Sequence, residues 1–253
     1  MSAPLMQVTG LHKAFGKVVT ARDLDFTFEE GVLTSIIGPN GAGKSTLINV
    51  LTGALAADSG RIEFMGKDIS GLPIHARVKL GLCRSFQVVN VFPELSVFEN
   101  VEIPVLSQMG RARNMFRPVA AEKEAKAEVE HVLEQVGLLE RASFTANKLS
   151  HGDQRLLEVG IALAARPKLL FLDEPTAGMN PVERVEILNN IRKLSEARTT
   201  SFVIVEHDMD IVFSLSDRVI VLHRGDIICD GDPAKVQCDE QVRECYLGEE
   251  VMG

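Results

Sequence analysis

Apolar and polar residues follow three regimes along this chain. Residues 24–28 alternate apolar with polar side chains, which is the two-residue period of a half-buried strand. An apolar run at 32–37 predicts a buried strand, glycines crowd residues 38–43, and residues 44–55 have helical character. The first regime is therefore strand, glycine-rich loop and helix, in that order.

The second regime covers the middle of the chain. Prolines punctuate the stretch that begins near residue 87, and residues 120–136 predict a helix with apolar side chains on one face. Gly137 stands where a helix C-cap is expected. We predict a mostly helical insertion over this part of the chain.

The third regime alternates strands and helices again. Residues 154–165 predict a helix, and a second helix follows Asn180, which is a good N-cap with proline after it. Residues 169–172 and 202–205 predict strands, and a hairpin is expected around residues 219–229. Such alternation predicts a mainly parallel sheet.

Composition narrows the classes of protein. The 253 residues carry a net charge of −8 and no long basic run, so nothing indicates a nucleic-acid-binding surface. No apolar stretch is long enough to span a membrane, and the N-terminus lacks the pattern of a signal peptide. The four cysteines form no CxxC pair, which favours thiols in a reducing compartment over a metal site.

The segment GPNGAGKST, which begins at Gly38, fills every fixed position of the pattern GxxxxGK[ST]. Its glycines, which include Gly41 and Gly43, allow close backbone approaches that a Cβ forbids. The resulting ring of N–H groups suits a β-phosphate. Lys44 is expected between the β- and γ-phosphates, and the Ser45 hydroxyl is expected to bind Mg²⁺. We therefore predict nucleotide binding.

Two acidic residues follow the strand predicted at 169–172. Ligands of an open α/β sheet lie beyond the carboxyl ends of its strands. Asp173 is expected to hold Mg²⁺ through water or Ser45, and Glu174 to polarise an attacking water. The alternative is a solvated turn that begins at these acids.

Residues 149–154 lie just ahead of a predicted helix. Ser150 and Gly152 place a hydroxyl and an open backbone at its N-terminus, which is a second anion site. This helix and the one after the phosphate loop do not easily reach one γ-phosphate within a single chain. We infer that the segment serves a nucleotide held by another copy; in isolation, a plain N-cap is the commoner interpretation of Ser150.

These segments together resemble the ATPase subunit of ABC transporters over nearly the whole chain. Six motifs stand in the family's order: Walker A at 38–46, the Q-loop at Gln87, the LSGGQ segment at 149–154, Walker B at 169–174, the D-loop at 177–180 and the switch histidine at His207. The resemblance implies one ABC ATPase domain over residues 1–253, of the α/β class. A P-loop NTPase core with a mainly parallel sheet and an antiparallel β part would comprise 1–86 and 155–253, and a helical subdomain 87–154.

The resemblance also implies a role for each matching residue. Phe15 matches the aromatic that stacks on adenine, with a core aromatic as the alternative. Gln87 would contact Mg²⁺ or the attacking water, and His207 would bind the γ-phosphate and hold Glu174. The residues expected to bind ATP are Phe15, Gly38, Asn40, Gly41, Gly43, Lys44, Ser45, Thr46, Ser150 and Gly152. The catalytic set is Glu174, His207 and Gln87, and the metal set is Ser45, Gln87 and Asp173.

Two motifs depart from the family's pattern. His151 lies beside Gly152 in the LSGGQ segment and Asp153 replaces its glutamine, while Asn180 stands where many relatives carry aspartate. His151 puts a titratable group beside the composite site, so a pH dependence can arise there. Neither departure removes Ser150, so activity is expected.

Finer features resemble the larger ATPase of branched-chain (hydrophobic) amino acid importers. They are the run 81–87, the stretch 105–119, the form of 177–180 and the ending at 246–249. Relatives in this group serve urea, amides and aromatic acids. We expect an ATPase that powers uptake of branched-chain or related amino acids; another ABC importer, or a lipopolysaccharide-transport or exporter ATPase, is the alternative. An ABC protein of DNA repair would need a long coiled coil, which the sequence lacks.

This resemblance also implies cofactors, partners and location. ATP and Mg²⁺ are expected in the site. The expected partners are a second ATPase subunit, identical or different, integral-membrane permease subunits, and a periplasmic substrate-binding protein reached through the permeases. No nucleic-acid partner is expected. The subunit would lie at the cytoplasmic face of the inner or plasma membrane as a peripheral protein.

Overall fold

The computed structural model describes residues 4–85, 91–110, 119–206 and 209–250 of the chain. Two residues expected in the site, Gln87 and His207, lie outside the described residues. Their predicted roles therefore stay predictions.

A six-stranded sheet forms the centre of the molecule, with the strand order β10-β9-β3-β8-β7-β6. Its strands are β3 (Thr34–Ile37), β6 (Leu82–Arg84), β7 (Leu169–Asp173), β8 (Ser201–Val205), β9 (Arg218–His223) and β10 (Asp226–Gly231). All neighbouring strands pair in parallel except β9 and β10, which form the expected antiparallel hairpin. The prediction of a mainly parallel sheet is confirmed.

A second sheet of four strands is antiparallel, in the order β2-β1-β4-β5. Its strands are β1 (Met6–Phe15), β2 (Val18–Phe28), β4 (Ser59–Phe64) and β5 (Lys67–Asp68). The alternation at 24–28 is the end of β2, where buried side chains face the core at every second position. The antiparallel part of the expected fold is therefore present.

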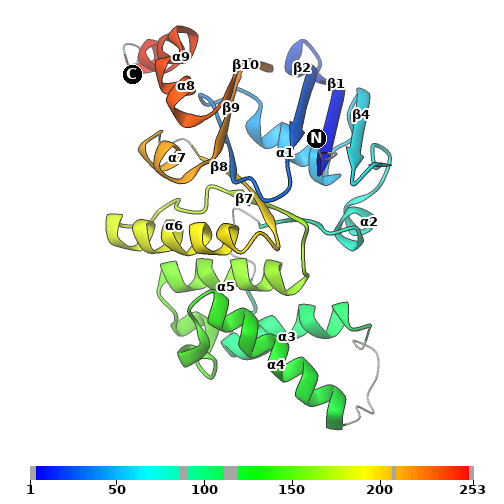
Figure 1. The fold of residues 1–253 in the computed structure, drawn as a ribbon, viewed down its shortest axis with the longest axis vertical. Helices are drawn as coiled ribbons and strands as arrows, with labels where there is room; N and C mark the ends of the chain where they lie inside the picture. Colours follow the sequence, from blue (N-terminus) through cyan, green and yellow to red (C-terminus); the bar gives the residue numbers. More distant parts are fainter. Residues whose placement is uncertain (1–3, 86–90, 111–118, 207–208, 251–253) are drawn as a thin grey trace.

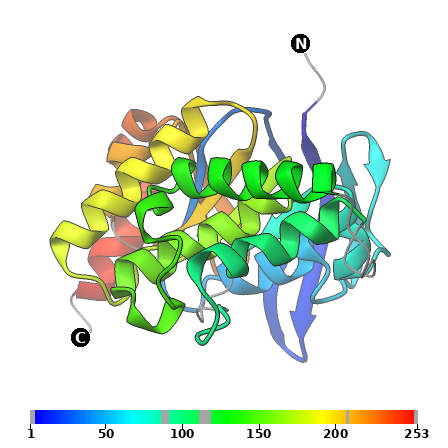
Figure 2. The same ribbon diagram turned by 90° about the horizontal axis from the view of Figure 1, so that it is seen from below.

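Helices α1 to α7 occupy connections between strands, and α8 and α9 follow the last strand, β10. They are α1 (Lys44–Thr52), α2 (Ile74–Lys79), α3 (Val97–Gln108), α4 (Val119–Gln135), α5 (His151–Ala164), α6 (Pro181–Glu196), α7 (Met209–Leu215), α8 (Pro233–Cys238) and α9 (Glu240–Glu250), with 3-10 turns at Leu139–Arg141 and Ala146–Lys148. Helices α3, α4 and α5 pack against one another and form the lower part of the molecule in Figure 1. Figure 2, seen from below, shows these three helices in front of the sheet.

Two of the three apolar cores formed by the described residues meet at strand β7 of the central sheet. Alternate residues of β7 point to opposite faces, so Leu170 and Leu172 join the core shared with α3, α4 and α5. Phe171 joins the core on the other face, where its ring meets the ring of Phe28 edge-on at 5.8 Å. Every residue of β7 is buried, which explains its unbroken apolar sequence before Asp173.

One helix begins earlier than expected from the sequence, and another contains one of the prolines noted there. Helix α5 begins at His151, not at residue 154, because Ser150 caps it by accepting a hydrogen bond from the Asp153 N–H. Helix α3 runs through Pro104 and starts from a capping box of Ser96 and Glu99, so Pro104 does not end this helix. The cap predicted at Asn180 is confirmed.

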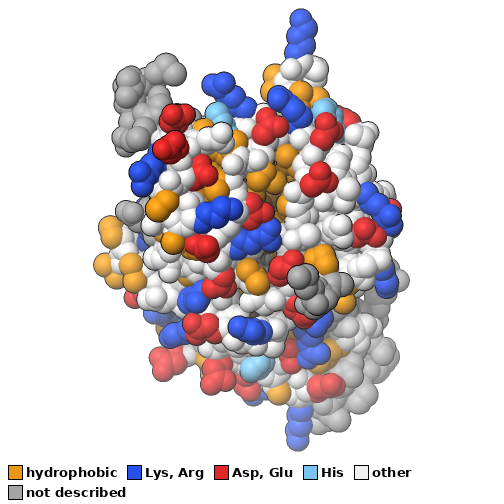
Figure 3. Space-filling model, turned by 45° about the horizontal axis from the view of Figure 1, so that its top comes forward, with side chains coloured by type: hydrophobic (Ala, Val, Ile, Leu, Met, Phe, Trp, Pro, Cys, Tyr) orange, Lys and Arg blue, Asp and Glu red, His pale blue; other side chains and the backbone are white. Residues whose placement is uncertain are grey.

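The surface carries charges of both signs. Figure 3 shows Lys and Arg side chains interspersed with Asp and Glu over the face it draws. Among the described residues, none of the helices has the length and apolar character needed to cross a bilayer.

Candidate nucleotide site

The predicted site residues leave the central sheet along one edge. Strand pairing aligns Ile36 of β3 and Asp173 of β7 with the same residue of β8, Val205. The loop after β3 and the acid pair after β7 therefore emerge at the carboxyl ends of parallel strands, where α/β sheets bind ligands.

The glycine-rich loop packs closely against strands β2 and β9. A Cβ on Gly38 would lie 2.1 Å from the carbonyl oxygen of Leu222 in β9, and one on Gly43 would lie 2.2 Å from that of Thr20 in β2. Gly41 has no such neighbour within 4 Å, but its φ of 78° is left-handed. Asn40 is exposed at the tip of the loop. The glycines at 38 and 43 are thus required by close backbone approach.

Helix α1 starts at the end of this loop without a side-chain cap. Its N-cap residue is Gly43, with φ of 106°, and its first turn carries no acidic residue. The first N–H groups of the helix and its dipole are therefore available to an anion. Ser45 is exposed and Thr46 half-buried in this first turn.

The Lys44 ammonium lies over the loop. Its Nζ donates to the carbonyl oxygens of Gly38 at 2.5 Å and of Pro39 at 3.0 Å. The backbone carbonyls of the loop therefore hold the side chain of the lysine that is predicted to bind phosphate. A pocket of about 610 Å³ opens beside the loop, and Asn40, Gly41 and His223 are among the residues that line it.

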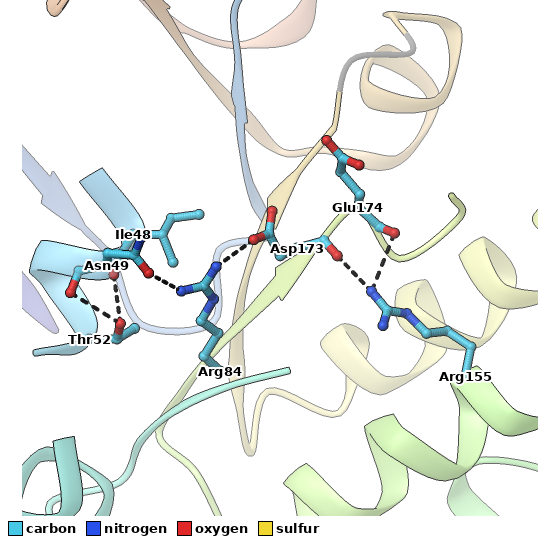
Figure 4. A network of polar contacts seen from close by, with 7 residues as sticks. All are labelled: Ile48, Asn49, Thr52, Arg84, Arg155, Asp173 and Glu174. Carbon is cyan, nitrogen blue, oxygen red and sulfur yellow. Dashed lines mark hydrogen bonds and ion pairs between the residues drawn. The ribbon is translucent and has the colours of Figure 1, made fainter. Parts of the chain in front are cut away.

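The two acids after β7 differ in burial and direction. Asp173 is 1% exposed, whereas Glu174 is half-buried and has a left-handed φ of 45°. The Glu174 N–H donates to the carbonyl oxygen of Val205 at 2.9 Å, which ties this turn to β8. Figure 4 shows the Asp173 carboxylate directed toward Arg84 and the Glu174 carboxylate directed away from it. The different orientations are compatible with the different roles predicted for the two acids.

Two arginines that sequence reasoning missed hold this pair in place. Arg84 Nη2 donates to Asp173 Oδ2 at 2.6 Å, and its Nη1 donates to Asn49 Oδ1 of α1 at 2.5 Å. Arg155 of α5 donates through Nη2 to the carbonyl oxygens of Asp173 at 2.6 Å and Glu174 at 3.3 Å. The only signal in the sequence was position: Arg84 precedes the Q-loop-like residues, and Arg155 follows the LSGGQ-like segment.

Ser150 and Gly152 lie at the start of α5, on a different element from the phosphate loop. The Ser150 hydroxyl donates to Asp153 Oδ2 at 2.9 Å, and Asp153 also pairs with Arg141. A Cβ on Gly152 would lie at an ordinary 3.5 Å from the Glu183 side chain. The fold itself therefore does not demand glycine at 152, which leaves room for a functional reason.

Phe15 is at the tip of the β1–β2 hairpin and is 51% exposed, so the core-aromatic alternative is wrong. The Lys13 Nζ lies 5.3 Å from the centre of its ring. Phe15 pairs with Val18, two residues before the Thr20 carbonyl that abuts Gly43. The exposed ring of Phe15 therefore stands at the end of β1, next to β2, the strand that contacts the phosphate loop.

The donor set suits Mg²⁺ bound mainly through a phosphate ligand. Within the described ranges, no group of three or more His, Cys, Asp or Glu could hold a metal ion by itself. Ser45 and Asp173 offer hard oxygen atoms, and Mg²⁺ usually keeps several waters and takes one or two protein carboxylates together with phosphates. The residues present fit that mode of binding.

Comparisons with known proteins agree with this geometry. Residues 21–177 match the protein family described as ABC transporter, and residues 227–251 match the one described as branched-chain amino acid ATP-binding cassette transporter.

Several curated proteins are similar to the chain over nearly its whole length. The high-affinity branched-chain amino acid transport ATP-binding protein BraF of Pseudomonas aeruginosa is 37% identical over 98% of this chain and 100% of its own. LivG of Escherichia coli, which carries the same description, is 35% identical with the same coverage.

Solved structures give the same result for the fold. An ATP-binding cassette of an ABC transporter in its ADP conformation superposes with a TM-score of 0.82 at 32% identity. The match covers 98% of this chain and 100% of that one. The expected fold class is confirmed.

Proposed function

The chain belongs to the ABC transporter family, and from that premise we propose that it is the ATP-hydrolysing subunit of an importer of branched-chain or related amino acids. The observation that carries the proposal is the shared sheet edge of the phosphate loop and the acid pair. The match of residues 227–251 and the names of the relatives support the class of substrate.

The described residues suggest how the triphosphate is held. The uncapped start of α1 and the loop N–H groups surround the β-phosphate, and Lys44 exchanges its contacts with the loop carbonyls for phosphate oxygens. Phe15 stacks on the adenine ring. Mg²⁺, when bound, would supply positive charge to the phosphates, and Ser45 and Asp173 would hold it.

Hydrolysis requires a water in line with the γ-phosphate. Glu174 stands beyond the strand end with its carboxylate directed away from the Arg84 side, and it takes a proton from that water as the water attacks. Gln87 and His207 complete the catalytic set in this proposal.

A second copy or a different ATPase subunit completes each site. Ser150 and Gly152 begin α5, and its N-terminus presents N–H groups to the γ-phosphate of a nucleotide held by the partner. Nucleotide binding closes the pair and hydrolysis opens it. The part of the helical insertion around residues 87–119 conveys this movement to permease subunits at the cytoplasmic face of the membrane.

Transport in a strain that lacks this gene tests the proposal. Uptake of labelled leucine, isoleucine and valine should be lost and then restored by the wild-type gene, but not by Glu174→Gln. Labelled urea and acetamide serve as comparison solutes. Loss of urea or amide uptake with intact leucine uptake would overturn the substrate class, and unchanged uptake of every solute would overturn the importer role.

A further inference from the structure

Arg84 joins three elements that carry parts of the site. It is the last residue of β6, its side chain is 15% exposed, and Ser85 begins the approach to the Q-loop-like segment. One arm of its guanidinium reaches Asp173 at the end of β7, and the other reaches Asn49 on the helix that follows the phosphate loop. Figure 4 shows this bridge between α1 and the acid pair.

The contact between Arg84 and Asp173 is a buried ion pair with defined geometry. The side chain of Asp173 is 2% exposed, and a buried carboxylate is stable only when a counter-charge and hydrogen bonds satisfy it. A guanidinium can donate from two nitrogens in fixed directions, whereas a lysine ammonium is a point charge on a flexible stem. The direction of the Asp173 carboxylate therefore depends on the fork of Arg84 and not on its charge alone.

The same residue leaves part of its own bonding capacity unused. Within the described part of the chain, Arg84 Nε and the neighbouring Ser85 Oγ are buried without a hydrogen-bond partner. Unpaired buried groups are uncommon in native proteins and call for an explanation. Both terminal nitrogens of Arg84 donate to residues next to the site, one to Asp173 and one to Asn49. The side chain thus connects these two residues at the cost of leaving Nε without a partner.

We propose that Arg84 is a positioning residue for the metal-binding carboxylate. Its fork fixes Asp173 relative to α1, so that the carboxylate and the Ser45 hydroxyl address the same Mg²⁺ when Mg-ATP binds. The inference rests on the proposed Mg-ATP site and assigns to it a residue that does not itself touch the nucleotide.

The variants separate charge from geometry. Arg84→Lys keeps the positive charge and loses the fork, and Asn49→Ala removes the α1 arm while it leaves the ion pair intact. Arg218→Lys is the matched control, because Arg218 makes a two-nitrogen pair with Asp230 at 2.7 and 2.6 Å on β9 and β10, outside the site.

The first measurement is the Mg²⁺ concentration that half-saturates ATP hydrolysis by the assembled transporter at saturating ATP. Arg84→Lys should raise it about tenfold, the loss expected for one charge-assisted hydrogen bond, and Asn49→Ala about threefold. The double variant Arg84→Lys/Asn49→Ala should be no worse than Arg84→Lys, because both arms serve one bridge.

The second measurement needs no turnover. The purified chain is unfolded by heat with a non-hydrolysable ATP analogue, and the added rise in midpoint caused by Mg²⁺ is recorded. This rise should shrink in Arg84→Lys and Asn49→Ala and stay unchanged in Arg218→Lys. If Arg84→Lys does not fold, Asn49→Ala alone decides.

The outcomes distinguish the inference from the proposed function. An unchanged Mg²⁺ requirement with a lower unfolding midpoint would show a structural ion pair only, and a lower Mg²⁺ requirement would show that Arg84 repels the metal; either result overturns the inference. A wild-type transporter without Mg²⁺-dependent hydrolysis would overturn the proposed site instead.

Discussion

Glu174 combines a left-handed backbone with a half-buried side chain. A φ of 45° is unfavourable for a residue with a Cβ, and it persists here because the Glu174 N–H bonds to Val205 and its carbonyl oxygen accepts from Arg155. Such strain is typical of positions that orient a functional side chain. At this scale, the residue is held by neighbours on both sides while its carboxylate stays outside the sheet.

Glu174→Gln keeps the size of the side chain and removes its ability to accept a proton. We expect phosphate release by the assembled transporter to fall by about 10²-fold or more, the usual contribution of a general base, with binding of a non-hydrolysable ATP analogue retained. Glu140→Gln, at an exposed carboxylate, is the control and should not change the rate. A Glu174→Gln rate within a factor of about two of the wild type would contradict the assigned role.

At the scale of elements, the phosphate loop depends on its contact with β2 and β9. The loop passes so close to the Thr20 and Leu222 carbonyl oxygens that the chain has no room for a Cβ at either point. Helix α1 then begins without a side-chain cap, whereas α5 and α6 begin with one. The close contact of the loop with β2 and β9, and not a local cap, therefore positions the start of α1.

A pair of alanine variants separates the effect of close packing against β2 from the effect of backbone strain. Both Gly41 and Gly43 have positive φ, so alanine at either costs about 1–2 kcal/mol. Gly43→Ala adds a clash with Thr20 and should lose a further 1–3 kcal/mol or so of unfolding free energy, whereas Gly41→Ala meets no atom within 4 Å. Urea unfolding measures both; equal losses would mean that the loop shifts away from β2 at little cost.

At the scale of the whole molecule, the phosphate loop and the start of α5 are two separate sites that expose backbone N–H groups. The contacts of the latter come from α5 and its neighbours: Ser150 bonds to Asp153, and Glu183 of α6 lies beside Gly152. Arg155 links this helix to the backbone of the acid pair. The helix that begins in the LSGGQ-like segment is therefore hydrogen-bonded to the acid pair of its own chain. The segment itself is predicted to bind the nucleotide held by another chain.

A negative charge at position 152 tests whether the start of α5 binds the nucleotide of a second chain. Gly152→Asp adds a negative charge to the N-terminus of α5, beside Glu183, and the proposal assigns this N-terminus to the γ-phosphate of a nucleotide held by the partner. Like-charge repulsion of about 1–4 kcal/mol should lower ATP hydrolysis tenfold or more. Analogue binding to the isolated chain should not change, because its own loop is intact. Gly152→Ala fits beside Glu183 and is the control for side-chain volume. Undiminished hydrolysis in Gly152→Asp would remove the second copy from the proposed site.

Local signals in the sequence determined much of this protein. The pattern at 38–46, the alternation at 24–28 and the cap at Asn180 each depend on residues a few positions apart, so they could be interpreted without a partner. The resemblance to ABC ATPases followed from the order of such segments. The class of the fold and most members of the candidate site were therefore available before the structure.

Only the tertiary structure selected the long-range partners. Arg84 and Asp173 are 89 positions apart, and the chain offers 35 acidic residues to any one arginine, so charge alone could not choose the pair. The start of α5 at His151 and the exposure of Phe15 likewise depended on what packs nearby. The physical reason is that periodicity and capping are short-range properties of the chain, whereas the pairing of buried charges is fixed by the order in which distant strands join the sheet.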